Sequence, residues 1–251
     1  MDAARTDRER EILSVLAKEG ASSVAALAKD LGVSDVTVRA TLRSLEARGL
    51  LKRTWGGAEL TPVHNVLERA AQHAAEKDRI ASAAAELVAD YDTVFIEAGT
   101  TTAQLVRHLG GRKGVQIVTN STLVLAAASA NPGVDVILTG GRFHRESESL
   151  VGPVAVRGVR GFNARLAFVG TDGFSVEHGM TTQFAEGAEV IAAMSERAEA
   201  TWLLADASKY ERTGFVPVLG LSQLTGIIVD AGLDRRAVDE LDEIAPNVRV
   251  V

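Results

Sequence analysis

Residues 95–109 read FIEAGTTTAQLVRHL and give the strongest indication of the fold. A short apolar run ends in a glycine and three threonines, and a segment with helical spacing follows. Runs of this kind recur through the second part of the chain: TVFIE, VQIVT, VDVILT, RLAFVG, TWLLAD and GIIVD. Near-continuous apolar strands that alternate with helices are typical of a parallel sheet covered on both faces. The sequence from Thr93 onward therefore predicts an α/β domain with a doubly wound, mostly parallel sheet.

Polar side chains and glycines follow five of these runs. The carboxyl ends of parallel strands meet at one edge of a sheet, which is where such domains bind ligands. We therefore expect one small polar pocket built from Gly99–Thr102, Thr119–Ser121, Thr139–Arg142, Thr171–Gly173, and Asp206 with Ser208 and Lys209. A glycine turn, threonine hydroxyls and a helix that starts near Thr101 fit an anion, and phosphate best. Threonines after a strand often serve only as helix caps, so this motif alone is weak evidence for an anion site. The polar residues at the other strand ends strengthen it.

The first fifty residues show a different pattern, that of three short helices. RTDREREILSVLAKEG, residues 5–20, has apolar residues at helical spacing and stops at Gly20. SSVAALAKDLG follows, with Ser22 or Ser23 as its N-cap and Gly32 as its end. VSDVTVRATLRSLEARG begins with Ser34 as the N-cap of a third helix. Its apolar face is predicted to hold Val38, Leu42 and Leu45, and its opposite face Arg39, Ala40 and Arg43.

The third helix has the features of a helix that reads the major groove of DNA. Arg39 and Arg43 can donate hydrogen bonds to guanine, and the hydroxyls of Ser34 and Thr37 at its start can meet phosphate oxygens. LLKRTWGGAEL then places basic residues, Lys52 and Arg53, in a hairpin signal about Gly56–Gly57. Together these segments predict a winged helix-turn-helix. The alternative is a small helical bundle whose arginines are only a solvated face.

Charge is unevenly distributed along the chain. The formal net charge is -6, yet residues 1–61 carry 10 Lys and Arg against 9 Asp and Glu. That leaves 17 basic and 24 acidic residues in the rest of the chain. Between Val36 and Gly56 one acidic residue, Glu46, stands among five basic ones: Arg39, Arg43, Arg48, Lys52 and Arg53. A local basic face on an acidic protein indicates a nucleic-acid partner for this segment.

Length and composition indicate a two-domain globular protein. The 251 residues favour two domains of unequal length. We expect a DNA-binding domain at 1–61, a linker helix at 62–76 and a ligand-binding α/β domain at 77–251. The chain has no cysteine, which excludes a disulfide framework. It has neither a signal-like start nor a run of about 18 apolar residues, so we expect a cytoplasmic protein without a membrane partner.

The motifs, taken in order, resemble those of the DeoR-type family of bacterial transcriptional regulators. The resemblance covers nearly the whole chain and rests on the helical head up to WGGAEL and on AEKDRIA, IEAGTTT, VTNS, LTGG, ESLVGP, FVGTDGF, GMTT and ADASKY. It implies a winged helix-turn-helix that binds operator DNA and a C-terminal domain similar to sugar-phosphate isomerases such as ribose-5-phosphate isomerase. In this family that domain senses a phosphorylated sugar. The resemblance further implies a repressor of carbohydrate metabolism genes that works as a homo-oligomer, a dimer or tetramer.

The same resemblance implies roles for individual residues. Thr100, Thr101 and Thr102 would hold the phosphate, with Lys209 as a positive partner, and Asn120, Asp172 and Glu186 or Glu189 would meet sugar hydroxyls. The whole predicted effector site is Gly99, Thr100, Thr101, Thr102, Asn120, Ser121, Gly140, Gly141, Arg142, Asp172, Gly173, Glu186, Glu189 and Lys209. Asn120 could instead cap the next helix and Asp172 could fix a turn. No cofactor is expected, and His64, His73, His108, His144 and His178 lack metal-ligand spacing.

The chain departs from the family pattern at two places. Ala40 and Thr41 stand where a second arginine and an acid are expected, and Ile191 stands where members often have lysine.

Two other functions are alternatives to a regulator. A sugar-phosphate isomerase would need a carboxylate to move a proton, for which Asp172 or Glu189 could serve. A purely structural dimerisation domain would leave the polar strand ends unexplained. We therefore expect a regulator and not an enzyme.

Overall fold

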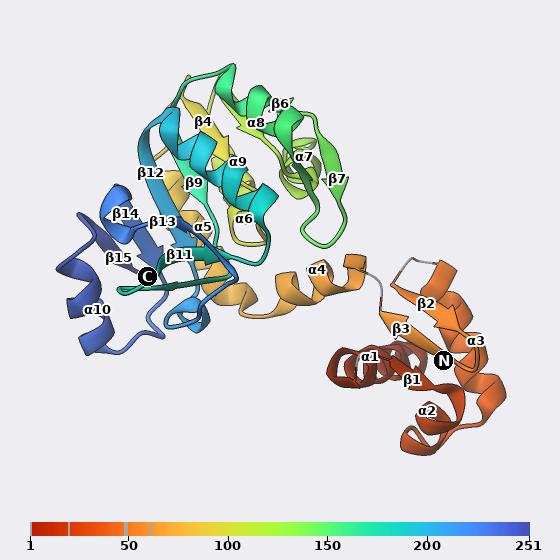
Figure 1. The fold of residues 1–251 in the computed structure, drawn as a ribbon. Helices are drawn as coiled ribbons and strands as arrows, with labels where there is room; N and C mark the ends of the chain where they lie inside the picture. Colours follow the sequence, from red (N-terminus) through yellow and green to blue (C-terminus); the bar gives the residue numbers. More distant parts are fainter. Residues whose placement is uncertain (1, 20, 48–49, 61) are drawn as a thin grey trace. The chain divides into compact units, whose positions relative to one another are not determined.

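The computed structural model describes residues 2–19, 21–47, 50–60 and 62–251 (Figure 1). Its internal contacts divide the chain into an N-terminal unit, Met1–Arg69, and a C-terminal unit, Ala70–Val251. Arg48, one of the five predicted basic residues, lies outside the described residues. Within the described ranges, no helix is both long enough and apolar enough to cross a membrane.

The N-terminal unit begins with three helices and a three-stranded sheet, as expected for a winged helix-turn-helix. The helices are α1 (Asp2–Glu19), α2 (Val24–Asp30) and α3 (Asp35–Ala47). The antiparallel strands lie in the order β1 (Ala21–Ser23), β3 (Gly57–Leu60) and β2 (Leu51–Thr54). Strand β1 was not predicted, because three residues directly before a helix carry no alternating pattern.

Serine side chains begin two of these helices. Ser23 Oγ accepts a hydrogen bond from the backbone N–H of Ala26 at 3.1 Å, at the start of α2. Ser34 Oγ accepts one from the N–H of Thr37 at 3.3 Å, at the start of α3. Each bond satisfies an amide that has no partner within its helix. The predicted cap at Ser34 is confirmed, and Ser23 is the cap of α2.

One apolar cluster holds the N-terminal unit together. It draws on all three helices and on strands β2 and β3, and its members include Ile12, Leu16, Val24, Leu27, Val38, Leu42, Leu45, Leu51 and Ala58. In α3 the buried positions recur every three or four residues, so one stripe of the helix faces the core. The opposite stripe of α3 is left to solvent.

Two helices lead into the C-terminal unit. The boundary between the units falls within α4 (Pro62–Ala71), and α5 (Ala74–Glu86) belongs to the C-terminal unit. Between them His73 adopts a left-handed conformation with φ of 52°, which breaks the helical path. The segment expected to be one linker helix, 62–76, therefore holds α4 and the first residues of α5.

Seven parallel strands form the main sheet of the C-terminal unit (Figure 1). Their order is β15 (Val248–Val250), β14 (Gly226–Val229), β12 (Ala198–Ala205), β9 (Ala164–Val169), β4 (Thr93–Ile96), β5 (Val115–Thr119) and β6 (Val134–Leu138). All six strands predicted from apolar runs are present. The edge strand β15 was missed, because its three residues, VRV, are too few to form a recognisable apolar run.

Helices cover both faces of this sheet, which confirms the doubly wound arrangement. On one face α5, α6 (Thr102–Leu105) and α7 (Thr122–Ala128) pack against strand residues that include Ile96 and Phe168. On the other face α8 (Pro153–Arg160) and α9 (Ala185–Glu196) pack against Phe95 and Ala167. Helix α10 (Arg235–Asp242) packs on this second face, through Leu241. Successive strand residues point to opposite faces, as the pleat requires.

Two small antiparallel elements accompany the parallel sheet. One is the hairpin of β7 (Arg142–His144) and β8 (Ser149–Val151). The other is a sheet of β10 (Gly173–Ser175), β11 (Gly179–Thr182) and β13 (Val216–Leu219). The sequence did not predict them, because strands of three or four residues leave no clear periodicity.

The strand order reverses between β4 and β9. The chain runs from β4 outward through β5 to β6, returns to β9 beside β4, and then runs outward on the other side through β12. In α/β sheets such a reversal is a switch point, and ligands bind there, outside the carboxyl ends of the two central strands. The segments that follow these strands are residues 97–102 and 170–172, so two of the predicted ligand segments flank the switch point.

Candidate functional site

Helix α3 presents a basic stripe to solvent. Arg39, Ala40 and Arg43 are exposed, whereas Val38 is fully buried. Thr41 is buried, and its hydroxyl donates to the carbonyl of Thr37 at 3.0 Å. The predicted separation of the two faces of α3 is confirmed. Of the two departures from the family pattern in this helix, only Ala40 lies where it could meet DNA, since Thr41 is engaged within the helix.

The start of α3 carries a linked pair of hydroxyl groups. The oxygens of Ser34 and Thr37 are 2.9 Å apart, and either group can donate the hydrogen bond between them. Ser34 is exposed and Thr37 half-buried, so both can be reached from solvent. A pair of hydroxyls beside the free amides of a helix start suits a phosphate contact, which stays a prediction for both residues.

The wing is the hairpin of β2 and β3. Lys52 and Arg53 lie exposed on β2, and Trp55 is fully exposed at the tip. The turn is formed by Trp55 and Gly56, not by the predicted Gly56–Gly57 pair, because Gly57 already pairs with Thr54. Gly57 must be glycine, since a Cβ atom there would lie 2.2 Å from the carbonyl oxygen of Ser22 in the adjacent strand.

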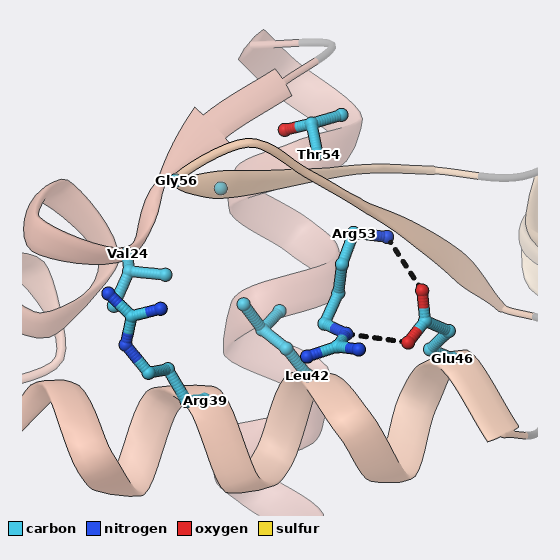
Figure 2. A pocket seen from close by; sticks show the side chains of 8 residues that line it. Val24, Arg39, Leu42, Glu46, Arg53, Thr54 and Gly56 are labelled. Carbon is cyan, nitrogen blue, oxygen red and sulfur yellow. Dashed lines mark hydrogen bonds and ion pairs between the residues drawn. The ribbon is translucent and has the colours of Figure 1, made fainter.

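A groove of about 240 Å³ lies between α3 and the wing (Figure 2). Arg39 and Glu46 line it from α3, and Arg53 lines it from the wing. The Arg53 guanidinium donates from Nε to Glu46 Oε2 at 2.5 Å. This bond holds the pKa of Glu46 below its ordinary value. Sequence reasoning treated Glu46 only as an exception to the basic run and assigned it no role.

We expect Arg39→Ala and Arg43→Ala to weaken operator binding. A contact that reads a base edge contributes about 1 to 3 kcal/mol of discrimination, so the preference for operator over random DNA should fall by about that amount. The measurement is competition binding of each variant with operator and random duplexes. A variant that loses affinity equally for both duplexes would show that its arginine contacts phosphate. Unchanged binding in both variants would contradict the assignment of α3 to the groove.

The turn after β4 lies on one side of the switch point in the C-terminal unit. The hydroxyl of Thr102 is fully buried and donates to the carbonyls of Glu97 at 2.7 Å and Gly99 at 3.1 Å. Its single O–H therefore stabilises the turn. Thr100 is half-buried and Thr101 is buried, and these two remain as hydroxyl donors for a ligand.

Helix α6 supports the predicted anion site less than the sequence suggested. It begins at Thr102 and has only four residues, and a 3-10 helix, Val106–Leu109, continues from it. The predicted helix start near Thr101 is confirmed within one residue. The macrodipole of so short a helix is small, so any affinity for phosphate must come mainly from side chains and turn amides.

Glu97 joins the ends of the two central strands, and sequence reasoning missed it. Its side chain is 8% exposed, and Oε2 accepts a hydrogen bond from the backbone N–H of Gly170 at 3.2 Å. Burial is the main cause that raises the pKa of Glu97 to about 8, and the negative charge of Asp172 raises it further. A carboxyl group at the switch point is therefore largely protonated at neutral pH. The signal was present in the sequence, as an acid that ends an apolar strand.

The segment after β5 is buried and fully hydrogen-bonded. Asn120 is 1% exposed, and its Oδ1 accepts from the N–H of Ala98 at 3.0 Å while its Nδ2 donates to the carbonyl of Leu150 at 3.3 Å. Ser121 Oγ accepts from the N–H of Val124 at 3.2 Å and so caps α7. The cap that was considered for Asn120 thus belongs to Ser121. Asn120 ties the β4 turn to strand β8.

The segment after β9 lies on the other side of the switch point. Asp172 is half-buried, and its Oδ2 accepts from the hydroxyl of Thr182 and from the N–H of Gln183, each at 2.9 Å. These two contacts join Asp172 to the end of β11. The turn before Gly173, which Asp172 was considered to fix, is held by the hydroxyl oxygen of Thr171, which accepts from the N–H of Gly173 at 3.2 Å. Gly173 is buried, and a Cβ atom there would lie 2.3 Å from the carbonyl oxygen of Arg212. The close approach of the Arg212 backbone therefore requires glycine at this position.

The other predicted ligand residues lie in different surroundings. Gly140 and Gly141 both have positive φ in the connection from β6 to β7. Arg142 forms an ion pair with Glu186 in the first turn of α9. Glu189 is exposed on α9, and Lys209 is half-buried after β12. Ile191, the departure noted in α9, is 3% exposed and packs in the apolar core, so it affects packing.

Solved structures align with parts of this chain. Ribose 5-phosphate isomerase A from Methanocaldococcus jannaschii aligns with a TM-score of 0.42 and 17% identity over 55% of each chain. A probable sor operon regulator from Shigella flexneri aligns with a TM-score of 0.45 and 15% identity, covering 67% of this chain and 88% of that one. The fold assignment rests on the parallel strand order and not on these values.

Sequence relatives are similar over nearly the whole chain. The HTH-type transcriptional regulator GlpR of Haloferax volcanii is 35% identical over 248 residues, which cover 96% of both chains. The lactose phosphotransferase system repressor of Lactococcus lactis subsp. lactis is 32% identical over 244 residues, which cover 94% of this chain and 95% of that protein. Residues 8–62 match the DeoR-like helix-turn-helix domain, and residues 72–231 match the DeoR C terminal sensor domain. The chain therefore belongs to the DeoR family of DNA-binding transcriptional regulators.

Proposed function

We propose that the chain represses genes of carbohydrate metabolism, and that a phosphorylated sugar bound in the C-terminal unit changes its affinity for operator DNA. The observation that carries this proposal is the convergence of polar segments at the carboxyl ends of β4 and β9. These segments supply hydroxyls from Thr100 and Thr101, a protonated carboxyl from Glu97 and a carboxylate from Asp172. Such a mixture of donors and acceptors suits a polyhydroxylated ligand.

Each end of the ligand has candidate partners. Thr100 and Thr101 and the amides of the turn would bind the phosphate, with Lys209 as the cation beyond β12. Glu97 in its protonated form can donate a hydrogen bond to a sugar oxygen, whereas Asp172 accepts hydrogen bonds from sugar hydroxyls. Glu186 and Arg142 form an ion pair that a ligand could open. Asn120 and Ser121 would shape the site through the backbone that they hold.

The relatives' functions point the same way. One relative is named a lactose phosphotransferase system repressor, and another, from Escherichia coli O157:H7, a putative aga operon transcriptional repressor. We infer that this chain also acts as a repressor, in the cytoplasm where operator DNA lies. Because helix-turn-helix proteins commonly read two related half-sites, we infer a homo-oligomer of at least two copies.

The test is a thermal-shift screen of the full chain against a panel of phosphorylated sugars. A ligand present at 100 times its dissociation constant should raise the free energy of unfolding by about 2.7 kcal/mol. The same sugars without phosphate serve as controls and should give little or no shift. If no sugar phosphate raises the melting temperature, or if the free sugars act equally well, the proposed effector class is wrong.

The screen also separates a sensor from an isomerase. Each sugar phosphate that binds should be recovered unchanged after long incubation with the protein. Steady conversion of an aldose phosphate to its ketose, abolished by Asp172→Asn or Glu189→Gln with DNA binding intact, would make the C-terminal unit an enzyme.

A further inference from the structure

Glu46 is an acid on the face that the N-terminal unit offers to DNA. It lines the groove between α3 and the wing together with Arg39 and Arg53 (Figure 2). A negative charge at this place opposes the approach of phosphate, and a DNA-binding face has no electrostatic use for it. Its contacts suggest a different use.

Both carboxylate oxygens of Glu46 bind one residue of the wing. Oε1 accepts from the backbone N–H of Arg53 at 3.1 Å, and Oε2 accepts from the Nε of its guanidinium at 2.5 Å. Figure 2 shows the two bonds as dashed lines between α3 and β2. One carboxylate thus fixes the backbone and the side chain of Arg53 together, so the orientation of the guanidinium follows that of the helix.

The hydrogen bond to Glu46 leaves most of the guanidinium N–H donors of Arg53 available. A guanidinium has five N–H groups, one on Nε and four on the two terminal nitrogens. Glu46 uses only Nε, and the terminal nitrogens of Arg53 have no hydrogen-bond partner within the part of the chain that the structure describes. Two parallel donors of this kind match two oxygens of a phosphate.

We propose that Glu46 is a positioning residue that holds Arg53 toward a DNA backbone phosphate bound in the groove between α3 and the wing. The site rests on DNA binding by the N-terminal unit and adds a residue to it. A strand of DNA whose major groove receives α3 and whose minor groove receives the wing passes its phosphates between the two, where this groove lies.

Removal of Glu46 should change the affinity for DNA in the direction opposite to that expected from its charge alone. Loss of a negative charge from a DNA-binding face normally strengthens DNA binding, through added attraction to phosphate. Loss of Glu46 should weaken it, because an unrestrained arginine must then be ordered during binding. The ion pair is partly exposed, with side-chain exposures of 44% for Arg53 and 35% for Glu46, so water and salt screen the repulsion between Glu46 and phosphate.

The first experiment measures binding of the full chain to a random-sequence duplex by fluorescence anisotropy. Glu46→Ala should weaken binding by roughly three- to tenfold, the scale of one charge-assisted contact. Asp30→Ala is the matched control, because it removes the same charge from an exposed position in the same unit. It should leave the affinity unchanged or raise it. Circular dichroism and the melting temperature establish that each variant is folded.

The second experiment is a double-mutant cycle with Arg53→Ala, which keeps the backbone amide that Glu46 also binds. Arg53→Ala should weaken binding and lower the slope of log affinity against log salt by about 0.9, the share of one phosphate. In that background Glu46→Ala should cost nothing further, because it acts through the guanidinium. Arg53→Lys should not restore binding, since an ammonium group cannot be held at one nitrogen and bind phosphate with two others.

Three results would overturn the proposal. Stronger binding by Glu46→Ala would show that the acid only repels DNA. An equal loss from Glu46→Ala with and without Arg53 would show that it only docks the wing through the backbone. Full binding by Arg53→Lys would show that the arginine fork is not used. A wild-type chain that binds no duplex would overturn DNA binding itself, which distinguishes that failure from the other three.

Discussion

The wild-type chain is expected to lose stability as pH rises through neutrality, and the Glu97→Gln variant is expected not to. Burial raises the pKa of Glu97 from its ordinary 4.5 to about 8, so the folded chain keeps a proton that the unfolded chain releases. The stability linked to this group is fully present below about pH 4.5 and is lost as pH rises through about 8. One pKa unit corresponds to about 1.4 kcal/mol, so the loss amounts to a few kcal/mol.

The glutamine variant isolates this effect. Its side-chain carbonyl can still accept from the N–H of Gly170, and it carries no charge at any pH. Denaturant unfolding of both proteins across this pH interval should therefore give converging stabilities at low pH and a more stable variant at high pH. Parallel profiles for the two proteins would contradict a protonated Glu97 in the folded state.

Asp92 supplies a control of opposite sign. Arg165 donates from Nε to Asp92 Oδ1 at 2.6 Å, and this bond keeps the pKa of Asp92 below its ordinary value. Its contribution to stability is present above the ordinary pKa of the group and is lost as pH falls through the lowered pKa. Asp92→Asn should therefore reduce stability at neutral pH and leave the loss at alkaline pH unchanged, unlike Glu97→Gln.

Thr101→Glu is expected to abolish the response to a sugar phosphate while DNA binding survives. Thr101 is buried in the turn after β4, and a carboxylate there would repel the phosphate of the ligand. The stabilisation of about 2.7 kcal/mol expected for the wild-type chain with saturating ligand should then vanish. A ligand shifts a conformational equilibrium only by its differential affinity for the two states, so its effect on operator affinity should vanish too.

Two measurements keep this prediction open to refutation. Thr101→Val has a similar volume without the hydroxyl or the charge, and it should bind the ligand more weakly than the wild type without losing the response. Operator affinity without ligand should be the same in the wild type and both variants, because the N-terminal unit has its own core. A normal ligand response in folded Thr101→Glu would place the phosphate elsewhere.

Long apolar runs made the architecture predictable. All six runs are strands of one parallel sheet. The N-cap and the apolar stripe of α3 could be predicted because helix periodicity and capping are local effects. The small antiparallel elements could not be predicted, since strands such as β10 form by pairing with a distant partner and carry no periodic signal. The break at His73 was also hidden, because a left-handed residue other than glycine has no sequence mark.

The meeting of the candidate site's segments was predictable, and the contacts of their side chains were less so. Parallel strand ends must meet at one edge, so the gathering of Gly99–Thr102 and Thr171–Gly173 followed from the strands alone. The partners of single side chains did not follow, because they depend on three-dimensional neighbours. Asn120 bridges Ala98 and Leu150, Arg142 pairs with Glu186, and the burial that makes Glu97 a weak acid comes from the fold around it.

The two tryptophans of the chain give each unit its own optical reporter. Trp55 is fully exposed at the tip of the wing in the N-terminal unit. Trp202 is 6% exposed in the core of the C-terminal unit, with the guanidinium of Arg249 5.3 Å from its ring. A soluble quencher such as iodide can reach the first indole and is shielded from the second. Emission from one chain therefore divides into a quenchable part that follows the wing and a protected part that follows the sheet, without an added dye.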